Sequence, residues 1–297
     1  MQPNLNFCSK HDLERNIVCE VCKKIKCEKC FKMEKDGHCK FEIHPEFLKK
    51  YEFISYIGRR FCDCSKVFKV KDFYNNFYAL KIIDYRYKPK NEVEHFSKIK
   101  HPNIIQYFSS EILESEKLLG ITIELAEFSL ADLMDNLSIE LANKYFFEMC
   151  LGVQNLHSNN ILHGNLKPSN ILITQNLAKI SDFRYLHRDV CEDHTQEFCL
   201  LFDSPEILWE NELSKKGDIW SLGIMFHMML SKGKFPFEKA KNTKKMLDTK
   251  RPMTIDPFLE NSKYETIIKG FLEYLLLFNY FFYYYKRLLK RRSISKI

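Results

Sequence analysis

The spacing of apolar residues changes along this chain of 297 residues, and that change limits the folds it can adopt. The segments VFKVKDF and FYALKIIDY alternate as β-strands do around the turn-prone pair Asn75-Asn76, and LLGITIEL has the apolar run of a buried strand. A short amphipathic helix is predicted from Glu92 to Lys100. Farther on, the spacing becomes helical through SIELANKYFFEMCLGVQNLH and again through DIWSLGIMFHMML. A small β-rich part followed by a larger helical part predicts an α+β fold.

Composition agrees with a folded chain and argues against several classes of partner. Hydrophobic residues make up 45% of the sequence, which is enough to bury a sizeable core. The net charge of +7 is a mild excess that accompanies 39 acidic residues, so we expect no nucleic-acid partner. The start, MQPNLNFCSK, lacks the parts of a secretory signal, which favours a cytoplasmic location. In that reducing compartment the 11 cysteines are expected to be metal ligands, reactive thiols or core residues before disulfides.

An aromatic segment near the end of the sequence, residues 274–285, contains no charged residue. It spans only about a dozen residues, whereas a helix that crosses a bilayer needs roughly 20. The following KRLLKRR would suit the cytoplasmic flank of a membrane helix. Because the segment is too short, we expect no membrane anchor and interpret it as a core helix with an irregular insertion.

The N-terminal part of the chain carries a dense series of cysteines and histidines. Three pairs with CxxC or CxxH spacing are followed by two single histidines: Cys8, His11, Cys19, Cys22, Cys27, Cys30, His38 and His44. Such a pair places two ligands on one tight turn, and tetrahedral Zn²⁺ takes four, so eight ligands predict two zinc sites. The alternative is a cysteine-rich turn without metal, whose thiols would have no apolar partner. With no open coordination position or general base nearby, both ions are expected to be structural and to provide the folding energy of this segment.

This spacing closely resembles the B-box zinc finger family, in which the first and third pairs share one ion. The resemblance implies that the first zinc site consists of Cys8, His11, Cys27 and Cys30. It implies a second site made of Cys19, Cys22, His38 and one further ligand, for which His44, Asp36 and Cys39 are candidates in that order. The chain departs from the family in the long gap after His38. We expect residues 1–46 to form a B-box-like zinc-binding module that docks protein partners.

Four motifs follow one another in a fixed order: HGNLKPSNILI, SDFRY, SPEIL and KKGDIWSLGIMF. Together they resemble the protein kinase family across about residues 51–297. The resemblance implies a bilobal protein-kinase-like fold behind the zinc-binding module, with a small β-rich N-lobe at about 51–123 and a larger α-helical C-lobe at about 127–297. It also implies that Asp218 supports the catalytic loop from below.

The same resemblance assigns residues to ATP and magnesium. Lys81 of YALK would hold the α and β phosphates and pair with a carboxylate on the next helix, which we place at Glu92 with Glu94 as its competitor. Asn170 and Asp182 supply hard oxygen ligands of the kind that Mg²⁺ prefers.

Further positions would contact the transferred phosphate and the adenine. Lys167 resembles the lysine with which serine/threonine kinases contact that phosphate. Ile123 would be the gatekeeper, and the main-chain groups of Glu124 and Ala126 would bond the adenine. The ring would lie between four apolar side chains, Ile57, Val67, Ala79 and Leu172.

The sequence departs from active kinases at the residue that accepts the proton of the substrate hydroxyl. Active members have an aspartate there, whereas this chain has Asn165, and an amide accepts no proton at physiological pH. Gly164 replaces an arginine that would hold a phosphorylated loop, Arg184 replaces the glycine after Asp-Phe, and Cys199 replaces a threonine. Gly58 is the only glycine in the phosphate-covering loop, IGRRFCDCSKVFKV, so contact with phosphates is expected to be weak.

These departures favour a serine/threonine-type pseudokinase with weak or no phosphotransfer, which would bind ATP and Mg²⁺ at most weakly and work through protein partners. The alternative is an active serine/threonine kinase that uses an unorthodox base, because the residues for phosphate and metal are retained. A third hypothesis, a zinc-dependent adaptor protein, depends on the zinc-binding module alone. The sequence therefore leaves open whether the protein is an enzyme.

Overall fold

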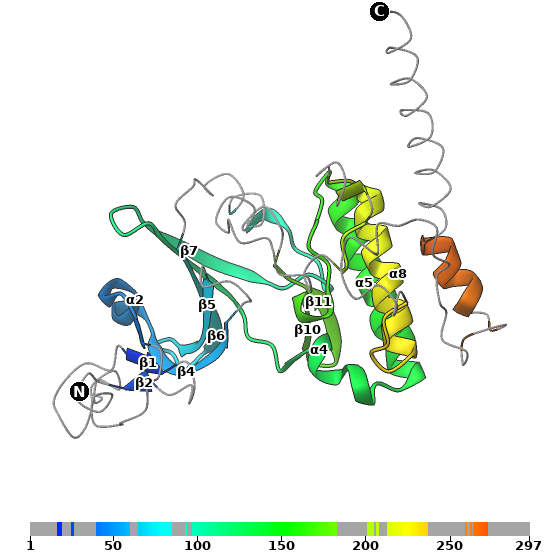
Figure 1. Ribbon diagram of the computed structural model, residues 1–297. Coiled ribbons are helices and arrows are strands. Elements are labelled where there is room, and N and C mark those ends of the chain that lie inside the picture. The colour runs from blue at the N-terminus through cyan, green and yellow to red at the C-terminus, as the bar shows by residue number, and fades with distance from the viewer. Residues whose placement is uncertain are drawn as a thin grey trace, which may run out of the picture. The chain divides into compact units, whose positions relative to one another are not determined.

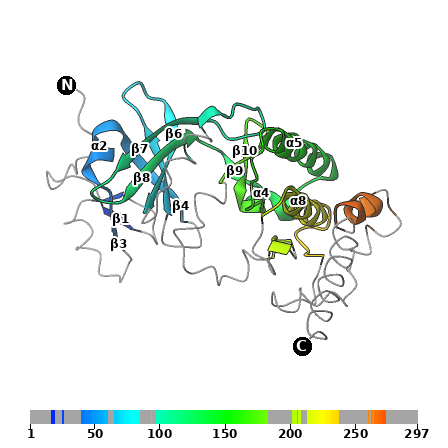
Figure 2. The same ribbon diagram turned by 90° about the horizontal axis from the view of Figure 1, so that it is seen from above.

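Two compact units make up the chain, and each is described by itself. The computed structural model describes residues 17–19, 25–26, 40–59, 65–84, 93, 97–182, 201–204, 206–207, 213–236, 259, 262 and 264–272. The first unit holds the described residues up to Lys100 together with Ile105–Ala126. The second unit holds His101–Ile104 and the described residues from Glu127 onward. Their elements are labelled in Figures 1 and 2.

The first unit is built on a five-stranded antiparallel sheet in the order β4-β5-β6-β8-β7 (Figure 1). Its strands are β4 (Glu52–Arg59), β5 (Ser65–Lys71), β6 (Phe77–Asp84), β7 (Tyr107–Leu113) and β8 (Leu118–Glu124). The three strands predicted from the sequence are confirmed as β5, β6 and β8. Because side chains alternate along a strand, Tyr78, Leu80 and Ile82 lie on one face of β6, and Ala79 and Lys81 lie on the other.

Asp72 fixes the turn between β5 and β6. Its carboxylate accepts hydrogen bonds from the main-chain nitrogens of Tyr74 (2.8 Å) and Asn76 (2.9 Å), from the Asn76 amide (3.0 Å) and from the Tyr78 hydroxyl (3.2 Å). Asn75 has a φ of 66°, a left-handed conformation that asparagine tolerates. The turn predicted at Asn75-Asn76 is therefore confirmed.

A smaller sheet and a short helix precede this sheet in the sequence. The strands β1 (Ile17–Cys19), β2 (Ile25–Lys26) and β3 (Lys40–Glu42) pair in the order β2-β1-β3. Helix α2 (Pro45–Lys50) is separated from β3 by two residues, Ile43 and His44, and His44 is its N-cap. Nδ1 of His44 accepts a hydrogen bond from the main-chain nitrogen of Glu46 at 3.3 Å.

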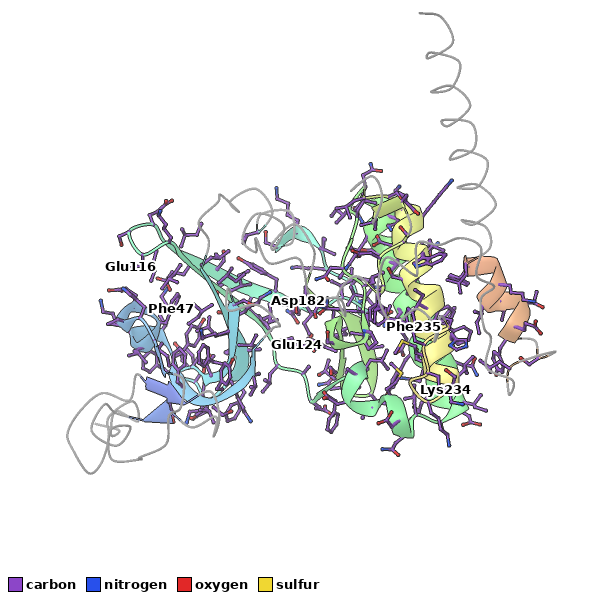
Figure 3. All side chains as sticks on the ribbon, in the orientation of Figure 1. Phe47, Glu116, Glu124, Asp182, Lys234 and Phe235 are labelled. Carbon is purple, nitrogen blue, oxygen red and sulfur yellow. The ribbon has the colours of Figure 1, made fainter. Side chains whose placement is uncertain are left out.

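Helix α2 closes the hydrophobic core on one face of the five-stranded sheet. Phe47 is 1% exposed, and Figure 3 shows its side chain on α2. The buried core contains Ile43, which precedes α2, and residues of α2, β4, β5 and β6: Phe47, Leu48, Phe53, Tyr56, Phe68, Val70, Leu80 and Ile82. A Cβ at Gly120, on β8, would lie 2.4 Å from Cε1 of Phe47, so the ring needs a glycine there. Two further contacts join this segment to the sheet, a hydrogen bond between the hydroxyls of Tyr51 and Thr122 (2.9 Å) and an ion pair between Lys50 and Glu111 (3.0 Å).

The second unit combines a small sheet with helices. Its elements are β9 (Phe128–Ser129), α4 (Leu130–Leu133), η1 (Met134–Asn136), α5 (Ile139–Ser158), η2 (Pro168–Asn170), β10 (Ile171–Thr174), β11 (Leu177–Ile180) and α8 (Lys215–Leu230). The strands pair in the order β11-β10-β9, and α5 packs against β11 and α8, as Figure 2 shows for the two helices.

The two long helices predicted from the sequence are confirmed as α5 and α8. Helix α8 begins at Lys215, before the apolar pattern does, because the Ser214 hydroxyl caps it by accepting a hydrogen bond from the main-chain nitrogen of Gly217 (3.1 Å). The five-stranded sheet followed by these helices confirms the α+β architecture.

Some predicted elements lie wholly or largely outside the described residues. Of the helix expected from Glu92 to Lys100, only Val93, Ser97 and Lys98 are described as helical. The aromatic segment 274–285 is outside the described part of the chain. None of the helices described here is both long enough and apolar enough to span a membrane.

Candidate functional site

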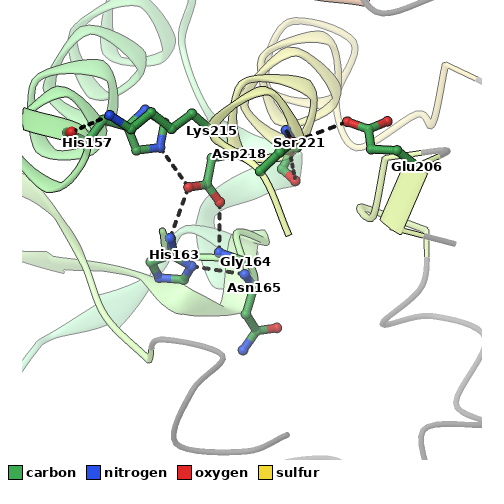
Figure 4. Close-up of polar contacts among 10 residues, drawn as sticks. His157, His163, Gly164, Asn165, Glu206, Lys215, Asp218 and Ser221 are labelled. Carbon is green, nitrogen blue, oxygen red and sulfur yellow. Dashed lines mark hydrogen bonds and ion pairs between the residues drawn. The ribbon is translucent and has the colours of Figure 1, made fainter. Parts of the chain in front are cut away.

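The loop between α5 and η2 contains His163, Gly164 and Asn165 and is held by Asp218 in the first turn of α8 (Figure 4). The Asp218 carboxylate accepts hydrogen bonds from the main-chain nitrogens of His163 (2.9 Å) and Gly164 (2.7 Å). Asp218 is 1% exposed, so these bonds are made away from solvent. The support of this loop by Asp218 that the sequence predicted is confirmed.

His157, in the last turn of α5, joins the same group. Its Nε2 lies 2.8 Å from Oδ2 of Asp218, and its main-chain carbonyl accepts a hydrogen bond from Nζ of Lys215 at 2.7 Å (Figure 4). These two contacts attach the C-terminal end of α5 to the N-terminal end of α8. The loop is therefore anchored to both helices.

Gly164 has a φ of 64°, in the left-handed region. Glycine reaches this conformation without a steric penalty, whereas a residue with a Cβ carries a cost of about 1–2 kcal/mol. The glycine that replaces the arginine of the family pattern therefore suits the backbone that the loop adopts.

Asn165 makes hydrogen bonds through both its backbone and its side chain. Its main-chain nitrogen donates to Nδ1 of His163 (3.1 Å), which leaves Nε2 of His163 to donate to the Ser181 carbonyl (2.9 Å). Its side-chain Nδ2 donates to the main-chain carbonyl of Asp182 at 3.1 Å. The amide nitrogen of Asn165, and not its oxygen, therefore faces Asp182.

Asn170 and Asp182 lie in the same hydrogen-bonded group. Nδ2 of Asn170 donates to the main-chain carbonyl of Asn165 (2.6 Å), and the Asn170 carbonyl accepts from the nitrogen (2.9 Å) and hydroxyl (3.0 Å) of Ser181. Asp182 follows with a φ of 70°. The structure thus brings together three residues that the sequence assigned to catalysis or magnesium, and Lys167 is buried in the same loop.

This arrangement decides what the loop can do chemically. A neutral amide at residue 165 offers neither a charge nor a proton acceptor to a hydroxyl group. The Asp182 carboxylate and the side-chain oxygen of Asn170 have the hard oxygen chemistry that suits Mg²⁺. Residue 165 therefore cannot act as a proton acceptor, and Asn170 and Asp182 are the residues of this site whose chemistry suits a metal ion.

The residues assigned to ATP in the first unit lie on the two central strands and their neighbours. Lys81 and Ala79 are buried on one face of β6, where they pair with Ile121 and Ile123 of β8. Lys81 also pairs with Val67 of β5, which in turn pairs with Gly58 of β4.

The other residues assigned to the adenine and phosphates lie on several different elements. Ile57 on β4 is 42% exposed, and the main-chain nitrogen of Glu124 donates to the Gln106 carbonyl at 2.9 Å. Ala126 follows β8, and Leu172 lies on β10 of the second unit, where it pairs with Ser129. Glu92, the expected partner of Lys81, is outside the described residues.

Two of the predicted zinc ligands fall within the described backbone. Cys19 ends β1 and pairs with Lys40 of β3, and His44 caps α2. Among described residues, no group of three or more His, Cys, Asp or Glu side chains is close enough to hold a metal ion. The other candidates lie outside the residues that the structure covers: Cys8, His11, Cys22, Cys27, Cys30, Asp36, His38 and Cys39.

Sequence reasoning missed two features of the site. The contact of His157 with Asp218 had a weak signal, since His157 is the last ionisable residue of a helical pattern that ends shortly before His163. The donation from Asn165 to the Asp182 carbonyl had none, because a sequence does not show which end of an amide will be used.

Comparison with known proteins identifies the family. Residues 51–279 match the family described as protein kinase domain. The chain is 26% identical to the human MAPK/MAK/MRK overlapping kinase over 62% of its own length and 47% of that protein. It is 30% identical to the serine/threonine-protein kinase shk2 of Schizosaccharomyces pombe over 51% of its length and 28% of that protein. It is 29% identical to the human SNF-related serine/threonine-protein kinase over 51% of its length and 21% of that protein.

These relatives are longer than the region that is shared. The chain spans between about a fifth and a half of the length of the curated relatives it matches. The match to the family nevertheless covers most of this chain, including the loop that carries Asn165. The chain therefore belongs to the protein kinase domain family, and its distant relatives are serine/threonine kinases.

Proposed function

We propose that this kinase family member is a pseudokinase of the serine/threonine type, with weak or no phosphotransfer, that acts through protein partners. One observation carries the proposal: the residue in the place of the proton acceptor is Asn165, and its amide nitrogen is bonded to the Asp182 carbonyl. An amide cannot take the proton of a substrate hydroxyl, and loss of a general base removes typically 10²–10⁴-fold in rate.

Other departures in the sequence support the same proposal. The phosphate-covering loop has Gly58 as its only glycine, Cys199 has no hydroxyl at the position of a threonine, and Gly164 lacks the charge to hold a phosphorylated loop. Positions 60–64 and 199 lie outside the described residues, so these arguments depend on residue type alone. Several parts of one phosphotransfer site are altered together.

The proposed binding of ATP with Mg²⁺ is weak, because the residues for both are retained while the phosphate-covering loop has a single glycine. Lys81 would neutralise phosphate charge, and Asn170 and Asp182 would hold the metal ion. The chemistry of Asn170 supports a fit, since its side-chain nitrogen donates to the main-chain carbonyl of Asn165, and its side-chain oxygen, which accepts from the Ser169 hydroxyl at 3.5 Å, is the hard oxygen that a metal ion would take. Bound Mg²⁺ would supply positive charge that neutralises the phosphates.

The zinc-binding module is proposed as a second docking surface, folded around two structural ions. The cap of α2 bears on the choice of its eighth ligand. While Nδ1 of His44 accepts a hydrogen bond, Nε2 carries the ring proton, so neither nitrogen of the neutral ring is available to a metal. This contact favours Asp36 or Cys39 over His44.

A phosphate-transfer assay tests the leading proposal. The full chain is incubated with ATP labelled at the γ-phosphate, Mg²⁺ and a protein substrate rich in serine and threonine, beside Lys81→Ala as the control. We expect label incorporation at the level of the control. Robust turnover that Lys81→Ala abolishes would instead establish the second candidate, an active serine/threonine kinase, which the retained Lys81, Lys167, Asn170 and Asp182 favour.

The third candidate, a zinc-dependent adaptor, is tested separately. Partner binding is compared before and after zinc is removed with a chelator. Binding that is unchanged without zinc dismisses the adaptor and leaves the kinase-like domain as the docking surface.

A further inference from the structure

The side chain of Asn165 connects the loop after α5 to the segment after β11. Its Nδ2 donates to the main-chain carbonyl of Asp182 at 3.1 Å, and the main-chain carbonyl of Asn165 accepts from Nδ2 of Asn170 at 2.6 Å. We propose that Asn165 is a positioning residue, whose amide holds the backbone of Asp182 in its left-handed conformation. The inference deepens the proposed function and rests on it in one respect, the assignment of Asp182 as a magnesium ligand.

The chemistry of the contact requires an amide. The Asp182 carbonyl can only accept hydrogen bonds, so the group that faces it must donate. An aspartate in the same rotamer would place a negatively charged oxygen about 3 Å from the carbonyl oxygen, where the two repel. Asn165 therefore has a structural role besides the absence of a base, because the fold uses its side-chain N–H donor, which an ionised aspartate lacks.

The bonds on either side of this contact show why it matters at Asp182. Ser181 is fixed by its nitrogen and hydroxyl to the Asn170 carbonyl, and its own carbonyl accepts from Nε2 of His163. The next residue, Asp182, has a φ of 70°, a conformation disfavoured for a residue with a Cβ. The bond from Asn165 lies at the residue where the chain takes this conformation.

A consequence follows for the site as a whole. Replacement of Asn165 by aspartate would give the loop a carboxylate and remove the bond that holds Asp182. The site is therefore not one substitution away from the arrangement of an active kinase.

The test compares two variants that lose the donor with one that does not. Asn165→Asp removes the donor and adds charge, and Asn165→Leu removes the donor at similar size without charge. The matched control is Asn176→Asp: the side-chain oxygen of Asn176 accepts a hydrogen bond from the Tyr145 hydroxyl at 2.8 Å, so an aspartate keeps that bond.

Hydrogen exchange of the full chain, followed by mass spectrometry, gives the readout. The reporter is the Ser181 amide, which donates to the Asn170 carbonyl at 2.9 Å, and amides of β6 report on the first unit. We expect exchange at Ser181 to rise about tenfold or more in Asn165→Asp and about threefold or more in Asn165→Leu. Exchange in Asn176→Asp and at β6 in all variants should stay within about twofold of the wild type.

Two results would overturn the inference. If Ser181 exchanges at the wild-type rate in both Asn165 variants, the amide does not hold this segment. If exchange rises equally at Ser181 and β6, Asn165 serves general stability and not the position of Asp182. Should Asn165→Asp fail to fold, Asn165→Leu gives the answer alone. Robust phosphate transfer by the wild type would refute the proposed pseudokinase and leave these exchange rates unaffected.

Discussion

Truncation of Phe47 to alanine should unfold the first unit at a markedly lower temperature, although the family match begins only at residue 51. The ring is buried against Gly120, whose missing Cβ would otherwise lie 2.4 Å from Cε1 of Phe47. Phe47 thus fills a space in the core of the five-stranded sheet. Its loss would leave a cavity beneath α2.

The magnitude follows from this burial. Phe47 is 1% exposed, and removal of a fully buried phenylalanine ring costs about 3–5 kcal/mol in unfolding free energy. For a unit of the size of the first one, which comprises the described residues up to Lys100 together with Ile105–Ala126, that loss corresponds to a fall in melting temperature of roughly 10 °C or more. Gly120→Ala should cost about 1–3 kcal/mol alone, because the added methyl group overlaps the ring. In the Phe47→Ala background the methyl group has room, so most of that cost should disappear.

Thermal unfolding followed by circular dichroism measures these effects in all single and double variants. Phe73→Ala is the matched control, because Phe73 is 81% exposed in the β5–β6 turn and its truncation should change stability by about 0.5 kcal/mol or less. Equal melting temperatures for Phe47→Ala and Phe73→Ala would refute the packing argument. Strict additivity of Phe47→Ala and Gly120→Ala would refute the contact between them.

Three further predictions concern single side chains. Asp218→Ala should lower the unfolding free energy by about 2–5 kcal/mol in urea denaturation, because two buried main-chain donors lose their acceptor, and an unchanged midpoint would contradict this. Burial raises the pKa of the Cys150 thiol to about 11. At about pH 8, iodoacetamide should therefore label Cys150 roughly a hundredfold more slowly in the folded chain than in concentrated urea. Mass spectrometry measures the two labelling rates, and equal rates would contradict this. Desolvation raises the pKa of Asp72, but hydrogen bonds from Asn76 and Tyr74 outweigh it and hold this pKa below 3.8. The ionised Asp72 carboxylate should therefore stabilise the fold above pH 3.8, and this stabilisation should be lost as the pH falls through the lowered pKa. Melting temperatures of Asp72→Ala and the wild type should therefore converge in strong acid, and a constant difference down to the lowest pH would contradict this.

The sheet and the long helices could be predicted because their signals are local. Alternation in VFKVKDF and FYALKIIDY gives strands whose two faces differ, and Asn75-Asn76 gives the turn between them. The position of α2 could not be predicted in this way. Its burial depends on Gly120, which lies far away in the sequence and shows no sign of its role except the absence of a side chain.

The candidate site was predictable in its residue types and less so in its contacts. The motifs placed Asn165, Asn170 and Asp182 in one site, and the structure joins them through main-chain carbonyls. Each side-chain amide points its nitrogen at a main-chain carbonyl, because a carbonyl can only accept a hydrogen bond. Which carbonyl lies within reach depends on the folded backbone. His44 is a further example of an unforeseen contact: its role as a zinc ligand stays a prediction, and its hydrogen bond at the cap of α2 had no signal in the cysteine and histidine spacing.

The central claim, that Asn165 leaves the site without a proton acceptor for phosphoryl transfer, is tested most directly under single-turnover conditions. The full chain is held in molar excess over ATP labelled at the γ-phosphate, with Mg²⁺, and label on protein and in free phosphate is followed beside Lys81→Ala. Excess protein makes even one transfer per molecule visible. We predict the same low level for the wild type and for Lys81→Ala. Transfer by the wild type that exceeds Lys81→Ala by orders of magnitude would contradict the claim.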